Sequence, residues 1–209
     1  MRGLRGWVVR PVHGHDPTGP LDGQPKGLRP GYAATMSLRC FLGHGASGTA
    51  ASMTPFVAGL RRRGVNAIAI DLPRRKAEDA LPAFHLVVPS ATDVAVGGHS
   101  YGGRVASLAA AESGAPYRAL VLFSYPLHPP GSPDRTAARI AHWQAIRCPV
   151  LLLSGESDPF ARIELLRTAV EALDRAELVT YPRLGHTLKP VLEDALDRAA
   201  AFLLLVADA

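Results

Sequence analysis

From Ser37 onward, the sequence alternates short, continuous apolar runs with longer segments whose apolar residues recur at helical spacing. The apolar runs that we predict to be strands span residues 38–42, 65–70, 94–99, 119–125, 150–154 and 176–181. Runs that are apolar on both faces and separated by helices are typical of a parallel sheet covered on both sides. We therefore predict an α/β fold over residues 36–209, with a compact, mostly parallel sheet of about six strands, helices on both faces and no large cap domain.

The predicted helices lie between these strands, at residues 53–63, 103–113, 136–143, 160–173 and 188–206. The segment 74–93 is harder to interpret, because it begins with three basic residues and carries an apolar piece, 84–88, between two prolines. A short helix is expected over 77–81, and the sequence assigns no structure to the rest of this segment.

Residues 1–35 differ from the rest of the chain. They contain seven glycines and five prolines with little apolar periodicity, so we expect a flexible tail. They lack the apolar core of a secretory signal, and the longest apolar run near the end, 199–207, is too short to span a bilayer. Because two cysteines make no disulfide framework, we expect a reducing, cytoplasmic location and no membrane partner.

The net charge of +5 argues weakly for an anionic partner, because residues 1–35 hold five basic and only two acidic residues. The remaining chain is nearly balanced and shows no basic stretch interleaved with aromatic residues. We therefore expect no nucleic-acid partner, and the sequence leaves the oligomeric state open.

A short motif marks the junction between the strand 94–99 and the helix that follows. Gly98-His99-Ser100-Tyr101-Gly102 fits G-x-S-x-G, in which the serine sits on a sharp turn at the carboxyl edge of a sheet. The glycines leave room for the strand and the helix to approach each other. Ser100 is our candidate nucleophile; an ordinary helix cap is the alternative.

A serine hydroxyl needs a base within hydrogen-bond reach and an acid that orients the base. Asp158 follows the strand 150–154, and His186 follows the strand 176–181. The chain order Ser, Asp, His, with each residue at the end of its own strand, is that of α/β-hydrolases. Taken singly, Asp158 could be a helix N-cap and His186 a loop histidine; Glu156 is the reserve acid.

A tetrahedral intermediate also needs two N–H donors for its oxyanion. The Tyr101 amide, directly after Ser100, is one candidate. The loop after the first strand supplies the other, with Ala46 as first choice and Gly45 or Ser47 in reserve. The alternative is a plain glycine-rich turn.

The remaining histidines receive other interpretations. His44 is expected to brace the oxyanion loop, and His128 to line the pocket, so both are possible pocket residues. His99 is expected to be packed and hydrogen-bonded, and His85 and His142 to be surface or packing residues.

No cofactor or metal is predicted, because no metal-ligand spacing or P-loop is present. The best rival interpretation is a dinucleotide site, because Gly43-x-Gly45-x-x-Gly48 matches G-x-G-x-x-G and Asp71 ends the next strand. That interpretation leaves Ser100, Asp158 and His186 unexplained.

Several segments together resemble a known family. They are His44-Gly45-Ala46, Gly98 to Ala106, Ser124-Tyr125-Pro126-Leu127-His128-Pro129-Pro130-Gly131, Gly155 with Asp158-Pro159-Phe160, and Gly185-His186. Over residues 36–206 the chain resembles the KANL3/Tex30-like α/β-hydrolases, which are similar to dienelactone-hydrolase-like proteins. The resemblance implies Ser100 as nucleophile, Asp158 as acid and His186 as base. The segment 71–88 looks shortened relative to the family.

The sequence therefore predicts a serine hydrolase that cleaves a small ester or thioester through an acyl-enzyme, with a small-molecule substrate in a shallow, open pocket. A non-catalytic interaction module with the same fold, and acyl transfer or peptide cleavage by the same three residues, are the alternatives.

Overall fold

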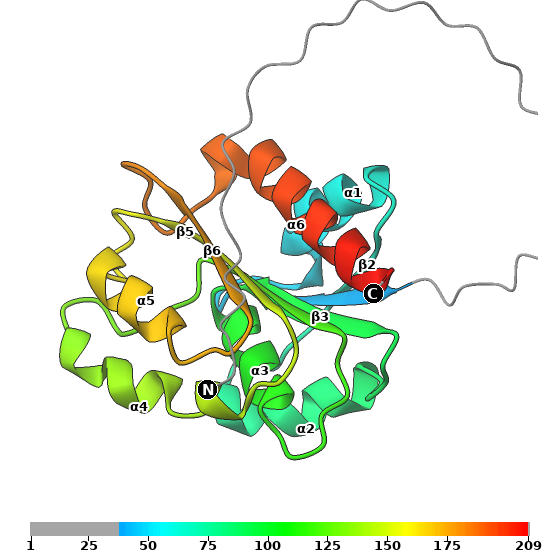
Figure 1. Cartoon of the computed structure of the whole chain (residues 1–209), viewed down its shortest axis with the longest axis horizontal. Coiled ribbons are helices and arrows are strands. Elements are labelled where there is room, and N and C mark those ends of the chain that lie inside the picture. Colours follow the sequence, from blue (N-terminus) through cyan, green and yellow to red (C-terminus); the bar gives the residue numbers. More distant parts are fainter. Residues whose placement is uncertain (1–37, 209) are drawn as a thin grey trace, which may run out of the picture. The chain divides into compact units, whose positions relative to one another are not determined.

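The computed structural model describes residues 38–208, so the expected tail, 1–35, lies outside the described residues. Six strands form one parallel sheet: β1 (Arg39–Gly43), β2 (Asn66–Ile70), β3 (Val94–His99), β4 (Ala119–Phe123), β5 (Val150–Gly155) and β6 (Ala176–Tyr181). They pair in the order β2-β1-β3-β4-β5-β6. The predicted α/β fold class is confirmed (Figure 1).

Six α-helices lie between or after the strands: α1 (Thr54–Arg62), α2 (Ala77–Val87), α3 (Tyr101–Ala110), α4 (Thr136–Ile140), α5 (Ile163–Val170) and α6 (Leu192–Ala207). Four short 3₁₀ turns accompany them: η1 (Ala50–Met53), η2 (Pro133–Arg135), η3 (Trp143–Ala145) and η4 (Lys189–Val191). None of the helices in this part of the chain is long and apolar enough to cross a membrane.

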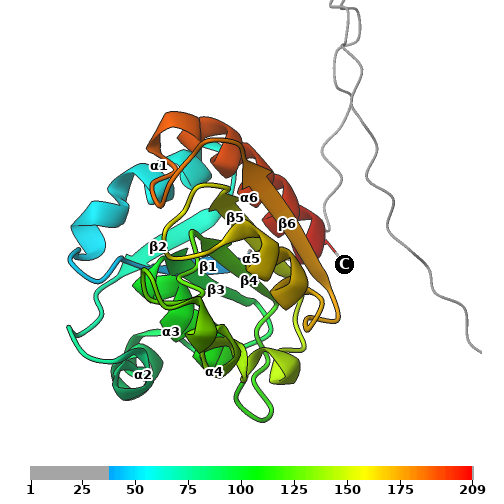
Figure 2. The same ribbon diagram turned by 90° about the vertical axis from the view of Figure 1, so that its left-hand side faces the viewer.

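The sheet has a separate apolar core on each face, because successive side chains of a strand point to opposite sides. In β4, Leu120 and Leu122 join the core beneath α2, α3 and α5, whereas Val121 joins the core beneath α1 and α6. Figure 2 shows α1 and α6 on one side of the sheet and α2, α3 and α4 on the other. Strands buried on both faces explain the continuous apolar runs of the sequence.

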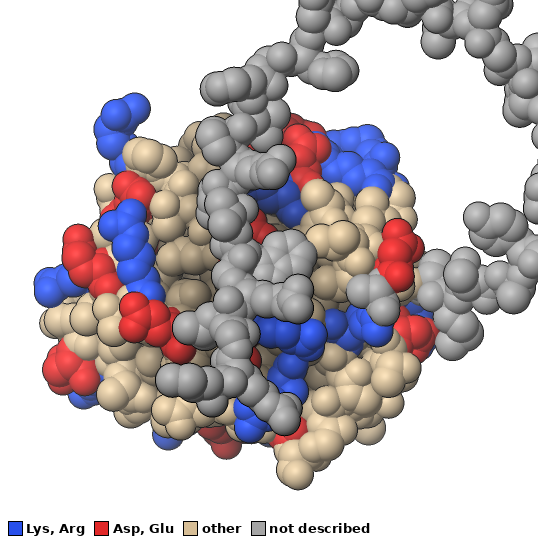
Figure 3. Space-filling view, in the orientation of Figure 1, with Lys and Arg blue, Asp and Glu red and all other residues tan. Residues whose placement is uncertain are grey.

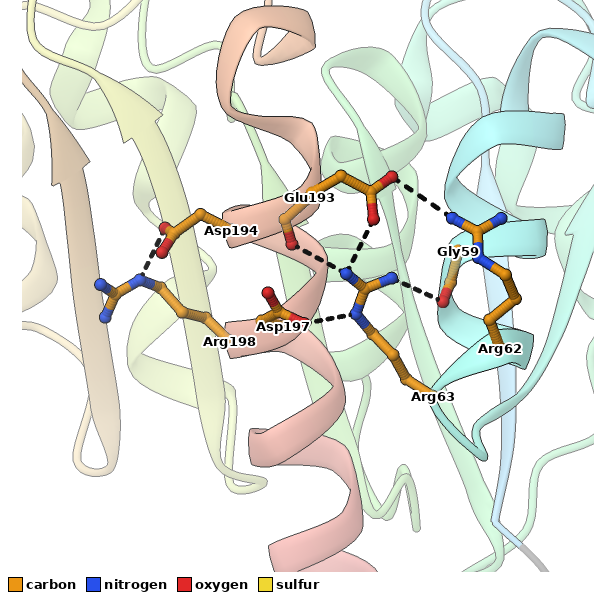
Figure 4. A network of polar contacts seen from close by, with 7 residues as sticks. All are labelled: Gly59, Arg62, Arg63, Glu193, Asp194, Asp197 and Arg198. Carbon is orange, nitrogen blue, oxygen red and sulfur yellow. Dashed lines mark hydrogen bonds and ion pairs between the residues drawn. The ribbon is translucent and has the colours of Figure 1, made fainter. Parts of the chain in front are cut away.

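On the face of the sheet that α1 and α6 cover, charged side chains join these two helices (Figure 4). The Arg63 guanidinium donates to Asp197 Oδ1 (2.6 Å), to Glu193 Oε2 (2.9 Å) and to the Gly59 carbonyl (3.0 Å). Arg62 and Arg63, at the end of α1, are therefore both paired with carboxylates of α6.

The segment 74–93, which the sequence left largely unassigned, contains a single helix. The expected short helix at 77–81 and the separate apolar piece 84–88 are both part of α2, which continues through Pro82. Pro82 lacks the N–H that would bond to the carbonyl four residues earlier. The helix persists because Ala77, Ala80 and Phe84 are buried on one side of it.

Candidate active site

The strand order places two loops at the same point of the sheet. From β1 the chain moves outward to β2 and returns to β3 on the other side of β1. The carboxyl ends of β1 and β3 therefore flank a topological switch point, where ligands bind in open α/β sheets. Ser100 follows β3 there, and His44 follows β1.

Ser100 occupies a strained turn between β3 and α3. Its backbone angles, φ 51° and ψ −113°, lie in a region that residues other than glycine rarely adopt. The Ser100 amide donates to the Phe123 carbonyl (2.9 Å), and the Ser100 carbonyl accepts from the Arg104 amide (3.0 Å). These bonds to β4 and to the first turn of α3 hold the turn in place.

Two glycines of the motif are required by crowding against β1. A Cβ on Gly102 would lie 2.2 Å from the carbonyl carbon and oxygen of Gly43, and one on Gly98 would lie 2.4 Å from the same oxygen. Gly98 also has φ 155°, which favours glycine. The G-x-S-x-G pattern thus lets α3 begin directly against the end of β1.

Three side chains from three strand ends form one chain of hydrogen bonds. The Ser100 Oγ lies 2.9 Å from His186 Nε2, and His186 Nδ1 lies 2.8 Å from Asp158 Oδ2. Because a carboxylate only accepts, Nδ1 carries the imidazole proton and Nε2 is free to accept from the Ser100 hydroxyl. The structure therefore brings together all three residues that the sequence singled out.

Asp158 is fixed by a second bond at the other carboxylate oxygen. Its side chain has no exposed surface, and its Oδ1 accepts from the Phe160 amide (2.8 Å). Asp158 thus caps the turn after β5 and contacts His186 as well. It is not the helix N-cap of the alternative interpretation, because α5 begins at Ile163 with Arg162 as its N-cap. Glu156, the reserve acid, instead accepts from Thr180 Oγ1 (2.8 Å) and Arg167 (3.1 Å).

Two aromatic rings lie next to the His186 imidazole. The Phe160 ring centroid lies 4.4 Å from that of His186, and the His99 centroid lies 5.4 Å away. Burial lowers the pKa of His99, and the nearby His186 lowers it further. A neutral His99 adds no positive charge beside His186, which fits its expected role as a packed residue.

The loops expected to form the oxyanion hole lie at the switch point. The Gly102 amide donates to the His44 carbonyl (2.9 Å), whereas the Tyr101 amide has no hydrogen-bond partner within residues 38–208. Ala46 and Ser47 lie in an exposed turn that the Gly48 amide closes onto the Gly45 carbonyl (2.9 Å). The Tyr101 amide is thus open to a ligand at the N-terminus of α3.

His44 and His128 are buried, and both brace the backbone. His44 Nδ1 donates to the Gly45 carbonyl (2.8 Å), and its Nε2 accepts from the Leu72 amide (3.0 Å). His128 repeats this pattern with the Pro129 carbonyl (2.9 Å) and the Arg162 amide (3.1 Å). Both ring nitrogens of each histidine are therefore already used, so neither imidazole is free to bind a substrate.

Two surface hollows border the site, one at Asp158 and one at Tyr101. One, of about 410 Å³, is lined by His128, Glu156 and Asp158 among others. The other, of about 660 Å³, begins at Tyr101 and contains five basic side chains. Sequence analysis missed this basic hollow, because its residues come from four separate segments; only the basic run that starts at Arg74 was visible as a signal.

The remaining interpretations find little support in the geometry. Asp71, which a dinucleotide site would use to bind a ribose, accepts from the Ala50 amide (2.7 Å) at the start of η1. Within the described part of the chain, no group of three or more His, Cys, Asp or Glu side chains could hold a metal ion.

Comparisons with known proteins agree with the architecture. Residues 72–204 match the family described as alpha/beta hydrolase domain. No curated protein matches the chain. Among solved structures, the chain is similar to Thermogutta terrifontis esterase 2 phosphorylated by paraoxon, with 19% identity over 81% of this chain and 83% of that chain and a TM-score of 0.68.

Two further structures show the same fold similarity. Est1E from Butyrivibrio proteoclasticus, bound to ferulic acid, is 18% identical over 86% of this chain and 93% of that chain, with a TM-score of 0.68. The Paleococcus ferrophilus monoacylglycerol lipase is 16% identical over 81% and 94%, with a TM-score of 0.66. The parallel sheet, the serine turn at its switch point and the match over residues 72–204 together establish that this chain belongs to the alpha/beta hydrolase domain family, whose fold it shares with carboxylic ester hydrolases.

Proposed function

We propose that the protein is a serine hydrolase that cleaves a small ester or thioester through an acyl-enzyme. The observation that carries the proposal is the hydrogen-bond chain from Ser100 Oγ through the His186 imidazole to the buried Asp158 carboxylate. Such a chain turns a weak nucleophile into a strong one, because the imidazole accepts the hydroxyl proton as the oxygen attacks.

In the first half of the reaction, Ser100 Oγ attacks the acyl carbon and its proton passes to His186 Nε2. The imidazolium that forms is stabilised by Asp158, whose position is fixed by the Phe160 amide. His186 then gives the proton to the leaving alcohol or thiol, and the acyl group remains on Ser100. Water, deprotonated by His186, releases the acid and restores the serine.

The negative charge of the tetrahedral intermediate requires N–H donors that are already in position. The Tyr101 amide is our first donor, because it stands at the first residue of α3 with the positive end of the helix dipole behind it. The Ala46 amide is the proposed second donor, on the loop that the buried His44 braces.

The substrate class follows from the surroundings of the serine. Between residues 38 and 208 the connections between strands carry short helices and no inserted domain, which favours small acyl groups. The resemblance to the KANL3/Tex30-like and dienelactone-hydrolase-like families is consistent with a small-molecule substrate.

A panel of 4-nitrophenyl esters tests this proposal. We expect turnover of the acetate and butyrate, slower turnover of the dodecanoate, and loss of all three activities in Ser100→Ala. Equal turnover by wild type and Ser100→Ala would refute a serine mechanism. A folded wild-type protein that hydrolyses none of the esters would favour the non-catalytic interaction module.

A further inference from the structure

The hollow of about 660 Å³ lies beside the proposed nucleophile. It is framed by the starts of α2 and α3, by Pro129 and by the segment that includes α4, and it begins at Tyr101, the residue after Ser100. Ser100 itself is not part of the lining, so a substrate attacked by Ser100 would reach this hollow with the part that extends past Tyr101. Its lining residues are Arg75, Lys76, Ala77, Glu78, Tyr101, Arg104, Pro129, Arg135, Ala138 and Arg139.

The charge of this hollow is strongly unbalanced. Five of the ten lining residues are Arg or Lys, and Glu78 is the one carboxylate among them. Glu78 is bonded to Arg104, which also donates to the Arg139 carbonyl (2.8 Å). The single negative charge is therefore already used to hold a buried arginine in place.

The other four cations of the hollow have no carboxylate within ion-pair distance among residues 38–208. They are Arg75, Lys76, Arg135 and Arg139. Asp79 and Asp134 are near in sequence, but neither lines the hollow. On the opposite side of the sheet, Arg62, Arg63 and Arg198 each pair with a carboxylate (Figure 4). Figure 3 shows Lys and Arg atoms together over the region of α3, and mixed signs over α5.

Two further observations concern the charge of this hollow. Burial lowers the pKa of Arg139 and the charge of Arg104 lowers it further, an effect that Tyr125 and Glu78 offset in part. The eleven-residue helix α2 also begins here, with Ala77 in the lining, and its first turn already carries two carboxylates, Glu78 and Asp79. A helix N-terminus beside basic side chains favours negative charge.

We infer that this hollow binds an anionic group of the substrate, so that the preferred ester or thioester carries a carboxylate or a phosphate on the part that extends past Tyr101. This inference rests on the proposed hydrolase function and specifies its substrate class. The cations that remain unpaired in the free protein would be neutralised by the substrate, which gains charge-assisted hydrogen bonds.

Matched pairs of substrates test the inference. The carboxylate pair is 4-nitrophenyl hydrogen glutarate and 4-nitrophenyl pentanoate, which differ chiefly in a terminal carboxylate. The phosphate pair is acetyl-coenzyme A and S-acetyl-N-acetylcysteamine, which share the thioester. In each pair the quantity measured is the ratio of kcat/KM for the anionic substrate to kcat/KM for the neutral one.

We expect this ratio to exceed one in at least one pair and to fall about tenfold or more in Arg139→Gln. That substitution retains the backbone carbonyl that accepts from Arg104. Arg139→Lys should restore part of the ratio, and added salt should lower it in the wild type. Arg198→Gln, on α6 outside the hollow, is the matched control and should leave the ratio unchanged.

The outcomes separate the two proposals. A preference in the glutarate pair identifies a carboxylate-bearing acyl group, and a preference in the coenzyme A pair identifies a phosphate-bearing leaving group; each supports the inference. Efficient hydrolysis with ratios near one that Arg139→Gln does not change overturns the inference and leaves the hydrolase proposal intact. If none of the four substrates is hydrolysed by folded protein, both proposals fail.

Discussion

Asp158→Asn tests how the hydrogen-bond chain prepares Ser100. In the wild type, Asp158 Oδ1 accepts from the Phe160 amide and Oδ2 accepts from His186 Nδ1, each at 2.8 Å. An asparagine has one oxygen and one NH₂ group. If its oxygen keeps the Phe160 bond, its NH₂ faces Nδ1 and favours the tautomer that carries its proton on Nε2. The imidazole then directs a proton at Ser100 and cannot accept one.

The opposite orientation of the amide is also unfavourable, because its NH₂ group would then face the Phe160 N–H, and two donors cannot bond to each other. The structure therefore predicts a loss of about 10⁴-fold in kcat for Asp158→Asn, the loss expected when the acid of a serine triad becomes an amide. Stability should change little, since the turn after β5 keeps its bond to the Phe160 amide.

Glu156→Gln is the matched control, because Glu156 follows the same strand and contacts Thr180 and Arg167 rather than His186. Initial rates of 4-nitrophenyl butyrate hydrolysis, with thermal unfolding measured in parallel, compare the two variants. A loss of less than tenfold in Asp158→Asn, or an equal loss in Glu156→Gln, would refute the assignment of Asp158 as the orienting acid.

Two further predictions concern stability. A Cβ on residue 102 would lie 2.2 Å from backbone atoms of Gly43, so Gly102→Ala should lower the free energy of unfolding by about 3 kcal/mol, measured by urea unfolding; an unchanged midpoint would contradict the crowding of α3 against β1. The pKa of His142 is lowered to about 4 by burial and then by Arg104. The unfolded chain, where histidine has a pKa of about 6.5, therefore binds this proton more readily as pH falls below that value. With allowance for its partial exposure, His142 should cost about 1 kcal/mol of stability between pH 7 and pH 5. His142→Gln should remove that difference, and equal pH dependence of the two proteins would disprove it.

The strands and the three candidate catalytic residues could be predicted from the sequence for the same reason. Ser100 and Asp158 stand at turns after strands that are buried on both faces and leave continuous apolar runs, and His186 stands at the turn after the half-buried edge strand β6. Parallel strands end at one edge of the sheet, so these positions in the sequence already predicted that the three residues would meet.

Other features could not be read in this way, because they depend on contacts between distant segments. Pro82 reads as a helix end, but burial of Ala80 and Phe84 keeps α2 continuous through it. The helix expected from residue 160 begins at Ile163, because the Phe160 amide is bonded to the Asp158 side chain.

The basic hollow beside Tyr101 was hidden for a related reason. Arg75, Arg104 and the neighbouring pair Arg135 and Arg139 come from three distant parts of the sequence and follow no motif. Only the packing of α2, α3 and α4 around one opening brings them together. The positive charge of the hollow can therefore be seen in the folded structure but not in the sequence.

The central claim, that Ser100 is an activated nucleophile, is tested most directly by covalent labelling. Folded protein is incubated with a fluorophosphonate probe, and the adduct is located by mass spectrometry of the intact chain and its peptides. We predict one phosphonyl group per chain, attached to Ser100, and no adduct in Ser100→Ala. Wild-type protein that stays unlabelled while folded, or that carries the adduct on another residue, would contradict the account.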